Sequence, residues 1–473
     1  MGNEHTCFLP AVEMRDRIER QDLTATELVE IMISRMEKLN PVLNAYCTPT
    51  YDLARDMARQ ADARVKEGGT VPLLNGIPTS IKDLMDTKGI RTTHGSKIYE
   101  HNIPTEDDVA VGRLKNAGIV MLGKTNTPEF GHSGTTQNKV FGETKNPWDL
   151  ERTPGGSSGG AAAACACGMS PLALGSDGGG SLRHPACFCG VFAIKPSFGR
   201  IPVHPTTGIA GELITHYGPI SRYVEDAALM LDAMKGPHEA DRYSLPGCDI
   251  MYHEHIHEHP ERIKIAYSTT LGHARVIDDQ VKNVVDRAVD EFTALDCSVE
   301  PVKMKMRNPE TGYYIWYTTM YGYDFRGKIK KWREDMDPNL VRMVEAGKTS
   351  SGLDIFRSLA ERRKIYAALY KVFKEYDILV TPTTAIPPFK LGMMYPEKIN
   401  GKGVSPTGWM PFTYPLNFTG HPAATVPAGF TTEGLPVGMQ IIGRRFDDLT
   451  VLQLSHAYEQ IKPWQDKLAP TCE

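Results

Sequence analysis

Apolar residues recur along the chain at two spacings, one typical of helices and one typical of strands. Between residues 24 and 39, leucine, isoleucine and methionine recur every three or four positions, which predicts a helix. Thr24 and Glu27 form a capping box at its start, and Asn40-Pro41 predicts its end. Residues 76–83 instead form a turn followed by alternating apolar and small or polar positions, which indicates a strand.

Helix-type and strand-type segments follow one another through the rest of the chain. The apolar pattern predicts further helices over residues 52–66, 107–117, 159–168, 224–235, 278–295, 353–376 and 448–460. It predicts further strands over residues 119–122, 171–175, 191–195, 262–267, 377–380, 423–427 and 437–442. This succession favours a layered α/β architecture. Because no internal repeat or linker interrupts the pattern, we expect a single domain over residues 1–473.

The composition is that of an ordinary soluble globular protein, with 41% hydrophobic and 23% charged residues. A net charge of −4 gives no electrostatic case for binding nucleic acid or an anionic membrane. No apolar stretch is long enough to span a bilayer. The chain has nine cysteines, an odd number, and no apolar signal segment opens it. Both features favour a cytoplasmic protein with free thiols.

Two glycine-rich loops with serines flank an alanine-rich segment in the middle of the chain. Residues 155–160 read GGSSGG, and residues 178–181 read GGGS. Glycine has no Cβ, so backbone N–H groups can crowd around a small charged atom in such loops. The second loop therefore predicts an oxyanion hole, with Ser181 as the attacking nucleophile.

These loops resemble those of the amidase signature family of serine hydrolases. That family combines GGSSGG, here residues 155–160, with D-x-G-x-S-[LIVM]-R-x-P, here residues 177–185. The resemblance extends upstream to GIPTSIKD at 76–83 and downstream to GLPVGMQIIG at 434–443, and so covers most of the chain. One departure is Gly178, where the family usually has serine or threonine. The resemblance implies an α/β/α sandwich around a mixed, mostly parallel β-sheet.

The same resemblance implies a Ser–Ser–Lys triad for this chain. Ser181 matches the nucleophile, Ser157 matches the bridging serine that follows a cis peptide bond, and Lys82 matches the base. A free lysine has a pKa of about 10.4 and is a poor base at neutral pH, but burial can lower that pKa by roughly 3–5 units. Neutral Lys82 would accept a proton from Ser157, which takes one from Ser181. The expected oxyanion donors are the backbone N–H groups of Gly178, Gly179, Gly180 and Ser181.

Other residues of these motifs have predicted supporting roles. Ser158 matches a serine that supports the site by hydrogen bonding, and we also place it among the substrate-binding residues together with Gly131, Ser133 and His184. A packed position for His184 is an equally good interpretation. Asp177 and Arg183 flank the nucleophile loop, and we interpret them as a structural ion pair.

Residues 303–352 are irregular in pattern and rich in tyrosine. One interpretation is a helical pair that packs on the sheet, and the other is an apolar lid over the site. Residues 387–410, rich in glycine and proline, are predicted to form a surface loop that also borders the site. Together we expect residues of about 303–416 to form the variable region of the substrate pocket.

Three rival interpretations remain. Residues 156–160 also fit G-x-S-x-G, the nucleophile elbow of α/β-hydrolases, but the polar segment before them does not look like the strand that an elbow needs. His253 and His257 fit the H-E-x-x-H pattern of zinc hydrolases, although prolines flank the segment closely. Some relatives are glutamine-using subunits of a tRNA-dependent amidotransferase. The tyrosine-rich region and Gly178 favour a free-standing amidase.

We therefore expect an amidohydrolase that cleaves a small-molecule amide through an acyl-enzyme on Ser181. Relatives act on aryl and alkyl amides, hydrazides and carbamates, so the resemblance does not fix the substrate. No cofactor or metal is expected, and neither nucleic acid nor a membrane is an expected partner. A homodimer is common among relatives.

Overall fold

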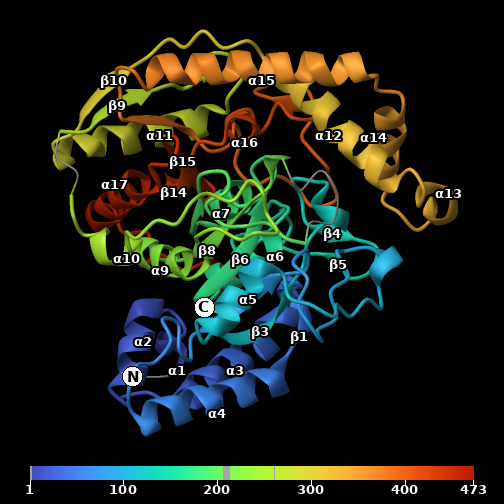
Figure 1. Ribbon diagram of the computed structural model, residues 1–473. Helices are drawn as coiled ribbons and strands as arrows, with labels where there is room; N and C mark the ends of the chain where they lie inside the picture. Colours follow the sequence, from blue (N-terminus) through green and yellow to red (C-terminus); the bar gives the residue numbers. More distant parts are fainter. Residues whose placement is uncertain (1–2, 206–212, 260–261, 473) are drawn as a thin grey trace.

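The computed structural model describes residues 3–205, 213–259 and 262–472. An eleven-stranded sheet runs through the middle of the molecule, between the N-terminal helices at one end and α15 at the other (Figure 1). In spatial order its strands are β1 (Tyr46–Pro49), β3 (Val120–Thr125), β2 (Pro78–Lys82), β6 (Leu172–Asp177), β8 (His216–Ser221), β7 (Phe192–Lys195), β14 (Ala423–Phe430), β15 (Pro436–Gly443), β11 (Ile378–Pro382), β9 (Lys264–Tyr267) and β10 (Ser298–Pro301).

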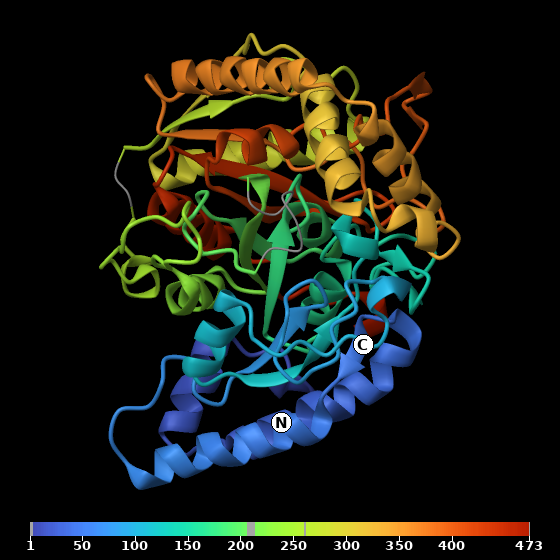
Figure 2. The ribbon, with the colours of Figure 1, turned by 45° about the vertical axis from the view of Figure 1, so that its right-hand side comes forward.

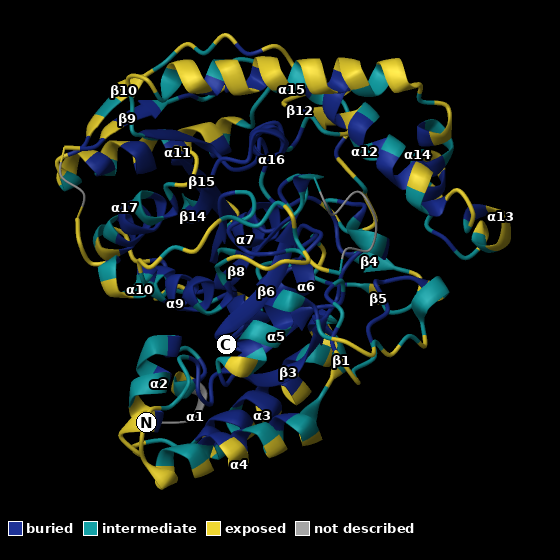
Figure 3. Ribbon diagram, viewed as in Figure 1, coloured by how far each residue is buried: buried dark blue, intermediate teal, exposed yellow. Residues whose placement is uncertain are grey.

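Helices cover both faces of this sheet, as the predicted α/β/α layering requires. In β2, β3, β6, β8, β11 and β15 every residue is buried. Successive side chains of a strand point to opposite faces, so burial at every position means that both faces are covered. Figure 3 shows the resulting buried centre, with exposed residues concentrated on outer helices such as α4 and α15.

The helices include all eight predicted segments and several that the apolar pattern did not predict. They are α1 (Asn3–Thr6), α2 (Ala11–Glu19), α3 (Ala25–Leu43), α4 (Tyr51–Glu67), α5 (Val109–Asn116), α6 (Gly159–Ala166), α7 (Arg183–Cys189), α9 (Val224–Met234), α10 (Tyr252–His255), α11 (Asp279–Asp290), α12 (Glu310–Phe325), α13 (Ile329–Trp332), α14 (Pro338–Lys348), α15 (Gly352–Val372), α16 (Tyr414–Thr419) and α17 (Asp448–Ile461). The described residues contain no helix long and apolar enough to cross a membrane.

The sheet is mixed, as expected, but the prediction that it is mostly parallel is wrong. Of the ten neighbouring strand pairs in the described sheet, six are antiparallel and four are parallel. The antiparallel pairs arise because β14 and β15 form a hairpin and because β8, missed by the sequence pattern, inserts between β6 and β7. Sequence periodicity reports that a strand is buried, but it does not report the direction of its neighbours.

The end predicted for the first long helix is also wrong. The Thr24 capping box is present, but α3 continues past Pro41 to Leu43 and ends at Asn44, which has a left-handed φ of 53°. Proline in the last turn removes one hydrogen bond and still allows the helix to continue. That extra turn buries Leu43 completely, on the face that also holds Leu39.

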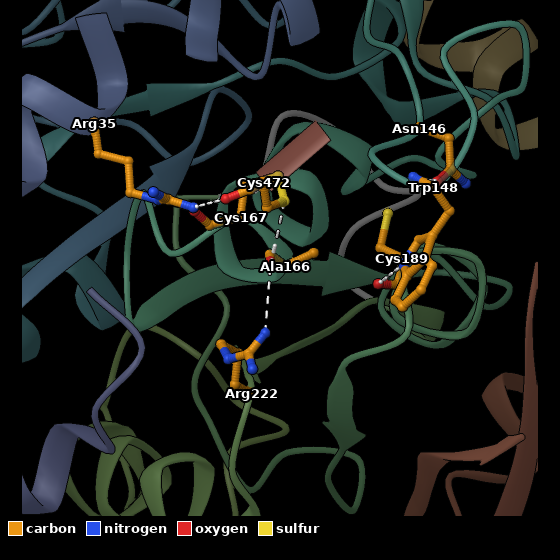
Figure 4. Close-up of a disulfide and its surroundings, with 8 residues drawn as sticks. All are labelled: Arg35, Asn146, Trp148, Ala166, Cys167, Cys189, Arg222 and Cys472. Carbon is orange, nitrogen blue, oxygen red and sulfur yellow. Dashed lines mark hydrogen bonds between the residues drawn. A yellow bond between two sulfur atoms is a disulfide. The ribbon is translucent and has the colours of Figure 1, made fainter. Parts of the chain in front are cut away.

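Cys167 and Cys472 form a disulfide, so the expectation of free thiols is wrong for this pair. Cys167 follows α6 and Cys472 lies near the end of the chain, 305 positions away (Figure 4). The Arg35 guanidinium lies beside the disulfide and donates hydrogen bonds to the carbonyl oxygens of both cysteines. The cysteine content therefore no longer supports a reducing compartment. Only the folded chain brings these two distant residues together.

The region after β10 resolves the two interpretations of the tyrosine-rich segment. Residues 310–348 form α12 and α14, which pack against each other on one side of the molecule (Figure 2). The segment is thus a helical pair, but it packs mainly on itself and, through α12, on α15 rather than on the sheet. Part of the pair lines the pocket described below, as the second interpretation expected.

Candidate active site

Lys82 is the last residue of β2, and its side chain is completely buried. Strand β2 lies between β3 and β6 and is parallel to both. The register with β6 carries Lys82 toward the end of that strand, where Ser176 and Asp177 lie. The Lys82 Nζ atom is 2.6 Å from Ser157 Oγ, 2.9 Å from Ser158 Oγ and 3.0 Å from Ser176 Oγ.

This environment favours the neutral amine of Lys82. Burial lowers the pKa of Lys82 well below its ordinary value, and the negative charge of Asp177 offsets only part of that effect. Within the described residues no carboxylate lies close enough to Lys82 to form an ion pair, and its hydrogen-bond partners are hydroxyl groups. A buried ammonium without a carboxylate partner is costly, so burial favours release of the proton.

Ser157 follows a cis peptide bond from Gly156, as the resemblance implied. The backbone of Thr135 passes directly behind this bond. A Cβ at Gly156 would lie only 2.7 Å from the Thr135 carbonyl atoms. The glycine is therefore required by close packing of two backbones. After Ser157 the chain enters α6, and no strand is described directly before this loop, so the nucleophile-elbow alternative lacks its required context.

Ser181 lies at the start of the segment that leads into α7, and it lines a pocket that opens to solvent. Its side chain is partly exposed, in contrast to Ser157 and Ser158. The backbone N–H of Ser158 donates to the Ser181 carbonyl oxygen over 3.2 Å, which ties the two glycine-rich loops together. Ser181 thus lies at a pocket wall, while Ser157 and Ser158 are buried behind it.

The predicted ion pair of Asp177 and Arg183 is confirmed. Both side chains are completely buried, and the guanidinium donates to both carboxylate oxygens over 2.9 Å. Burial alone would raise the pKa of Asp177, but Arg183 and a hydrogen bond from Asn417 hold it far below its ordinary range. Arg183 also donates to Gln440 and Asn417, so the pair joins the nucleophile loop to β15 and α16. Such bidentate pairs fix geometry as well as charge.

One of the expected oxyanion donors is already occupied. The Gly180 N–H donates to Asp177 over 2.6 Å, and the Leu182 N–H donates to the other carboxylate oxygen of Asp177 over 3.2 Å. Gly180 is therefore unsuitable as a donor in this conformation. Among the hydrogen bonds of the described residues, the N–H groups of Gly178, Gly179 and Ser181 have no acceptor.

The pocket beside Ser181 has a volume of about 280 Å³. Gly131, Ser133 and His184, three of the residues predicted to bind substrate, line it. Ser158 is fully buried beside Lys82 and is absent from the pocket wall, so its predicted substrate contact is wrong, whereas its supporting hydrogen bond is present. His184 accommodates both earlier interpretations, since it lines the pocket and is also packed beside Trp409.

His184 is held as a neutral ring. Its Nε2 atom is 2.6 Å from Thr413 Oγ1. Burial is the largest influence on this imidazole, and it lowers the pKa of His184 to about 3. A neutral histidine at the pocket wall contributes shape and hydrogen bonding without adding a positive charge.

Most of the remaining pocket wall comes from residues 303–416. Most of these side chains are aromatic or thioether groups: Tyr313, Tyr314, Tyr317, Met343, Met394, Tyr395, Trp409 and Met410. The set is completed by Asn339, Arg342, Pro406 and Thr407. The loop predicted over residues 387–410 contributes several of them, so it does border the site. An apolar wall of this kind suits a small, largely apolar ligand.

The histidines of the H-E-x-x-H segment do not converge on one site. His253 Nδ1 is 2.7 Å from an Asp232 carboxylate oxygen, whereas His257 is 3.2 Å from both His456 and Glu225. α10 has only four residues and ends before His257. No group of three or more potential metal ligands occurs among the described residues. The arrangement does not fit the zinc hydrolase alternative, which needs both histidines on one helix face.

Several residues of the site were missed by the sequence analysis. Ser176 contacts Lys82, but it lies just before the motif and looks like an ordinary strand residue. Tyr313, Thr413 and Asn417 contact the nucleophile loop from more than 130 positions away. The tyrosine-rich composition was the only signal that pointed toward Tyr313.

The geometry gathers a buried lysine and three serine hydroxyls behind a pocket that Ser181 lines. Comparison with known proteins identifies the family. A family model described as Amidase matches residues 27–452. An acylamidase from Rhodococcus erythropolis is 37% identical, over 99% of this chain and 98% of that protein. A glutamyl-tRNA(Gln) amidotransferase subunit from Carboxydothermus hydrogenoformans is 36% identical, over 96% of this chain and 97% of that protein.

Solved structures with the same fold include an aryl acylamidase and a cyclic dimer hydrolase. A bacterial aryl acylamidase described as an amidase signature enzyme has a TM-score of 0.91 and 30% identity, with 97% of each chain covered. A 6-aminohexanoate cyclic dimer hydrolase has a TM-score of 0.90 and 26% identity, with 99% of this chain and 100% of that chain covered. The chain belongs to the amidase signature family, and it is an amidohydrolase that acts on amide C–N bonds.

Proposed function

We propose that this amidohydrolase uses Ser181 as nucleophile, Ser157 as proton bridge and Lys82 as base. The observation that carries the proposal is the position of a completely buried lysine 2.6 Å from Ser157 Oγ, with hydroxyl groups rather than carboxylates around it. Burial of this kind favours the neutral form of lysine, and a neutral lysine can act as a base.

The hydrogen bonds around Lys82 support this direction of proton transfer. Ser158 Oγ donates its only hydrogen to the Ser176 carbonyl oxygen over 3.3 Å, so it can only accept from Lys82. A neutral amine has two N–H donors and one lone pair. We place the two N–H groups of neutral Lys82 on Ser158 and Ser176, which leaves its lone pair for the Ser157 hydroxyl proton 2.6 Å away.

The proposed reaction follows from that arrangement. Lys82 takes the Ser157 proton as Ser157 takes the Ser181 proton, and Ser181 Oγ forms a bond to the amide carbon. The resulting oxyanion accepts hydrogen bonds from the backbone N–H groups of the nucleophile loop that have no acceptor among the described residues, those of Gly178, Gly179 and Ser181. The proton returns through Ser157 to the departing nitrogen, and the C–N bond breaks. Water then attacks the acyl carbon, and its proton passes through Ser157 to Lys82. The proton returns through Ser157 to Ser181 Oγ as the acid product is released.

We propose that the acyl or amine group of the substrate is small and largely apolar or aromatic. The aromatic and thioether side chains of residues 303–416 line the pocket, and its volume of about 280 Å³ sets the size. Aryl and alkyl amides, hydrazides and carbamates all meet this description. The relatives named as acylamidases support amides as the first class to test.

The test is amine release from a panel of anilides, alkyl amides, hydrazides and carbamates, measured for the wild type and Ser181→Ala in the presence of EDTA. We expect one class to be cleaved by the wild type and turnover to fall by at least about 10³-fold in Ser181→Ala. A fluorophosphonate probe should label the wild type and not the variant. Wild-type turnover by Ser181→Ala would overturn the triad.

A second candidate function is that of an amidotransferase subunit, favoured by the 36% identity to one from a glutamyl-tRNA(Gln) amidotransferase. Such a subunit takes glutamine as its amide. If the purified chain cleaves anilides or alkyl amides by itself, the free-standing amidase is supported. If it cleaves glutamine alone, the amidotransferase role is supported.

The homodimer, the cytoplasmic location and the single-domain organisation over residues 1–473 stay predictions. Sedimentation of the purified chain tests the first, and a single cooperative unfolding transition is the expected behaviour of one domain.

A further inference from the structure

The loop of residues 177–180, here called the oxyanion loop, accepts a hydrogen bond at each of its four backbone carbonyl oxygens. The Asp177 carbonyl oxygen accepts from Asn417 Nδ2 over 2.7 Å, and the Gly178 carbonyl oxygen accepts from the Tyr313 hydroxyl over 3.1 Å. The next carbonyl, of Gly179, accepts from Thr413 Oγ1 over 2.8 Å. The Gly180 carbonyl oxygen accepts from the backbone N–H of His184 over 2.7 Å.

These bonds determine where the N–H groups point. A peptide group is planar, and in its trans form the C=O and N–H bonds point in opposite directions. When a donor holds the Gly178 carbonyl from behind, the N–H of Gly179 faces away from that donor. The loop needs such control because three successive glycines have unusually free backbones. Neither Gly178 nor Gly179 has a side chain that could prevent its peptide group from turning over.

We propose that Tyr313 is a positioning residue of the oxyanion hole, which orients the Gly178–Gly179 peptide so that the Gly179 N–H faces the carbonyl oxygen under attack. This inference rests on the proposed function of Ser181. Tyr313 acts through the loop and does not itself bond the oxyanion, because its single hydroxyl hydrogen is donated to Gly178.

The surroundings of Tyr313 are built for a fixed position. Its side chain is 5% exposed, and its ring contacts those of Tyr317, Tyr414 and Phe418, at centroid distances of 5.3, 4.8 and 5.4 Å. Burial raises the pKa of the Tyr313 phenol well above its ordinary value, so the hydroxyl keeps the hydrogen that it donates.

The lack of a side chain at Gly179 leaves room for the Tyr313 hydroxyl. A Cβ added at Gly179 would lie 2.2 Å from the Tyr313 hydroxyl oxygen, closer than any real contact allows. The hydroxyl therefore occupies the space beside the glycine that a side chain would fill. Gly178 stands where most of the family has serine or threonine. Gly178 has no hydroxyl of its own, and the hydroxyl that bonds its carbonyl oxygen belongs to Tyr313 of α12.

The experiment compares Tyr313→Phe with Tyr321→Phe. Tyr321 lies two turns further along α12, is equally buried at 5%, and donates a similar hydrogen bond of 3.0 Å to the Phe130 carbonyl oxygen. Both substitutions remove one buried phenol-to-carbonyl bond, so both should lower stability similarly. For Tyr313→Phe we expect kcat to fall about 10- to 100-fold with KM within threefold, since misaligned oxyanion donors act on the transition state. For Tyr321→Phe we expect kcat within twofold of wild type.

A boronic acid whose organic group resembles the acyl part of the best substrate supplies a second readout. It forms a tetrahedral adduct with a nucleophilic serine, whereas the matching carboxylate product resembles the ground state. Tyr313→Phe should weaken boronic acid binding by the same factor as kcat and leave product binding unchanged. The pH at which kcat/KM rises should not move, because Lys82 is untouched.

A double-mutant cycle keeps the test independent of the folding of one variant. Gly179→Ala should lower kcat strongly beside the tyrosine hydroxyl and much less in the Tyr313→Phe background, where the closest clash is gone. Equal kcat for Tyr313→Phe and wild type, a loss confined to KM, or an equal loss in Tyr321→Phe would overturn the inference. If the boronic acid does not bind wild type and Ser181→Ala keeps its turnover, the proposed function fails instead.

Discussion

Two buried lysines on neighbouring strands show how similar positions can serve different ends. Lys82 ends β2, and Lys124 lies in β3, the strand parallel to it. Both side chains are completely buried. The register pairs Lys124 with Ile81, one residue before Lys82, so the two lysines project to opposite faces of the sheet.

The two lysines differ in the charges around them. Lys82 Nζ contacts three serine hydroxyls, whereas Lys124 Nζ donates to the Met85 carbonyl oxygen and to Thr87 Oγ1 and lies in the field of Asp83, Asp86 and Asp108. Burial lowers the pKa of Lys124 to about 8. The nearby carboxylates raise the pKa and so limit this decrease. The pKa of Lys82 is lowered well below its ordinary value by burial, and among the described residues Asp177 is the one group that opposes this effect. A buried lysine becomes a base only where acidic neighbours are weak.

The largest effect is expected for Lys82. Lys82→Met should reduce kcat/KM by about 10³- to 10⁴-fold through loss of the base. Lys82→Arg should be as inactive, because a guanidinium stays protonated at any usable pH. Steady-state kinetics on the best amide substrate measures both, with thermal unfolding as the check on folding. Substantial activity of Lys82→Arg would exclude a neutral base at this position.

Lys124→Met should affect stability and leave catalysis nearly unchanged. The substitution leaves the Met85 carbonyl and the Thr87 hydroxyl without their buried donor, so the free energy of unfolding should fall by about 1–3 kcal/mol. Denaturant unfolding measures this change, and kcat of the folded protein should stay within threefold of wild type. A loss of kcat comparable to that of Lys82→Met would show that the two lysines are not separate in function.

The pH dependence of kcat/KM should report Lys82 alone. Because the neutral amine is the active form, activity should be lost as the pH falls through the depressed pKa of Lys82, and it should be full at neutral to alkaline pH. Lys124→Met should not change the pH at which kcat/KM is half lost. A shift of that pH in the variant would mean that the two amines are coupled.

The free energy of unfolding should also depend on the protonation of Lys82, and it should rise with pH. The unfolded chain binds a proton on Lys82 up to its ordinary pKa, whereas the folded chain releases it at lower pH. Between those two values the free energy of unfolding of wild type, relative to Lys82→Met, should rise with pH by about 1.4 kcal/mol per unit. Unfolding measured at several pH values tests the slope, and a slope of zero would place the proton on folded Lys82.

The smallest effect is expected for Ser176→Ala. This removes one of the three hydroxyl contacts of Lys82, 3.0 Å away, and leaves the contacts with Ser157 and Ser158. A single hydrogen bond contributes about 0.5–1.5 kcal/mol, so kcat should fall by roughly tenfold or less. A larger fall than that of Lys82→Met would make Ser176 a member of the proton path.

The residues of the motifs could be found from the sequence because their chemistry depends on local backbone form. Glycines at 155–160 and 178–181 and the serines between them belong to loops whose shape is determined within a few residues. The ion pair of Asp177 and Arg183 spans one such loop, and it is present as expected. Most helices and strands also lie where the apolar periodicity predicts them, since burial of one face depends on local spacing.

The tertiary structure alone decided the contacts between distant segments. Strand direction in the sheet, the disulfide of Cys167 with Cys472, and the contacts of Tyr313 and Thr413 with the nucleophile loop each join residues more than 130 positions apart or elements whose order the sequence does not encode. Even Lys82 and Lys124 look alike in sequence, as lysines in buried strands. Their different pKa values come from groups that the fold gathers around them, because electrostatic interactions act through space rather than along the chain.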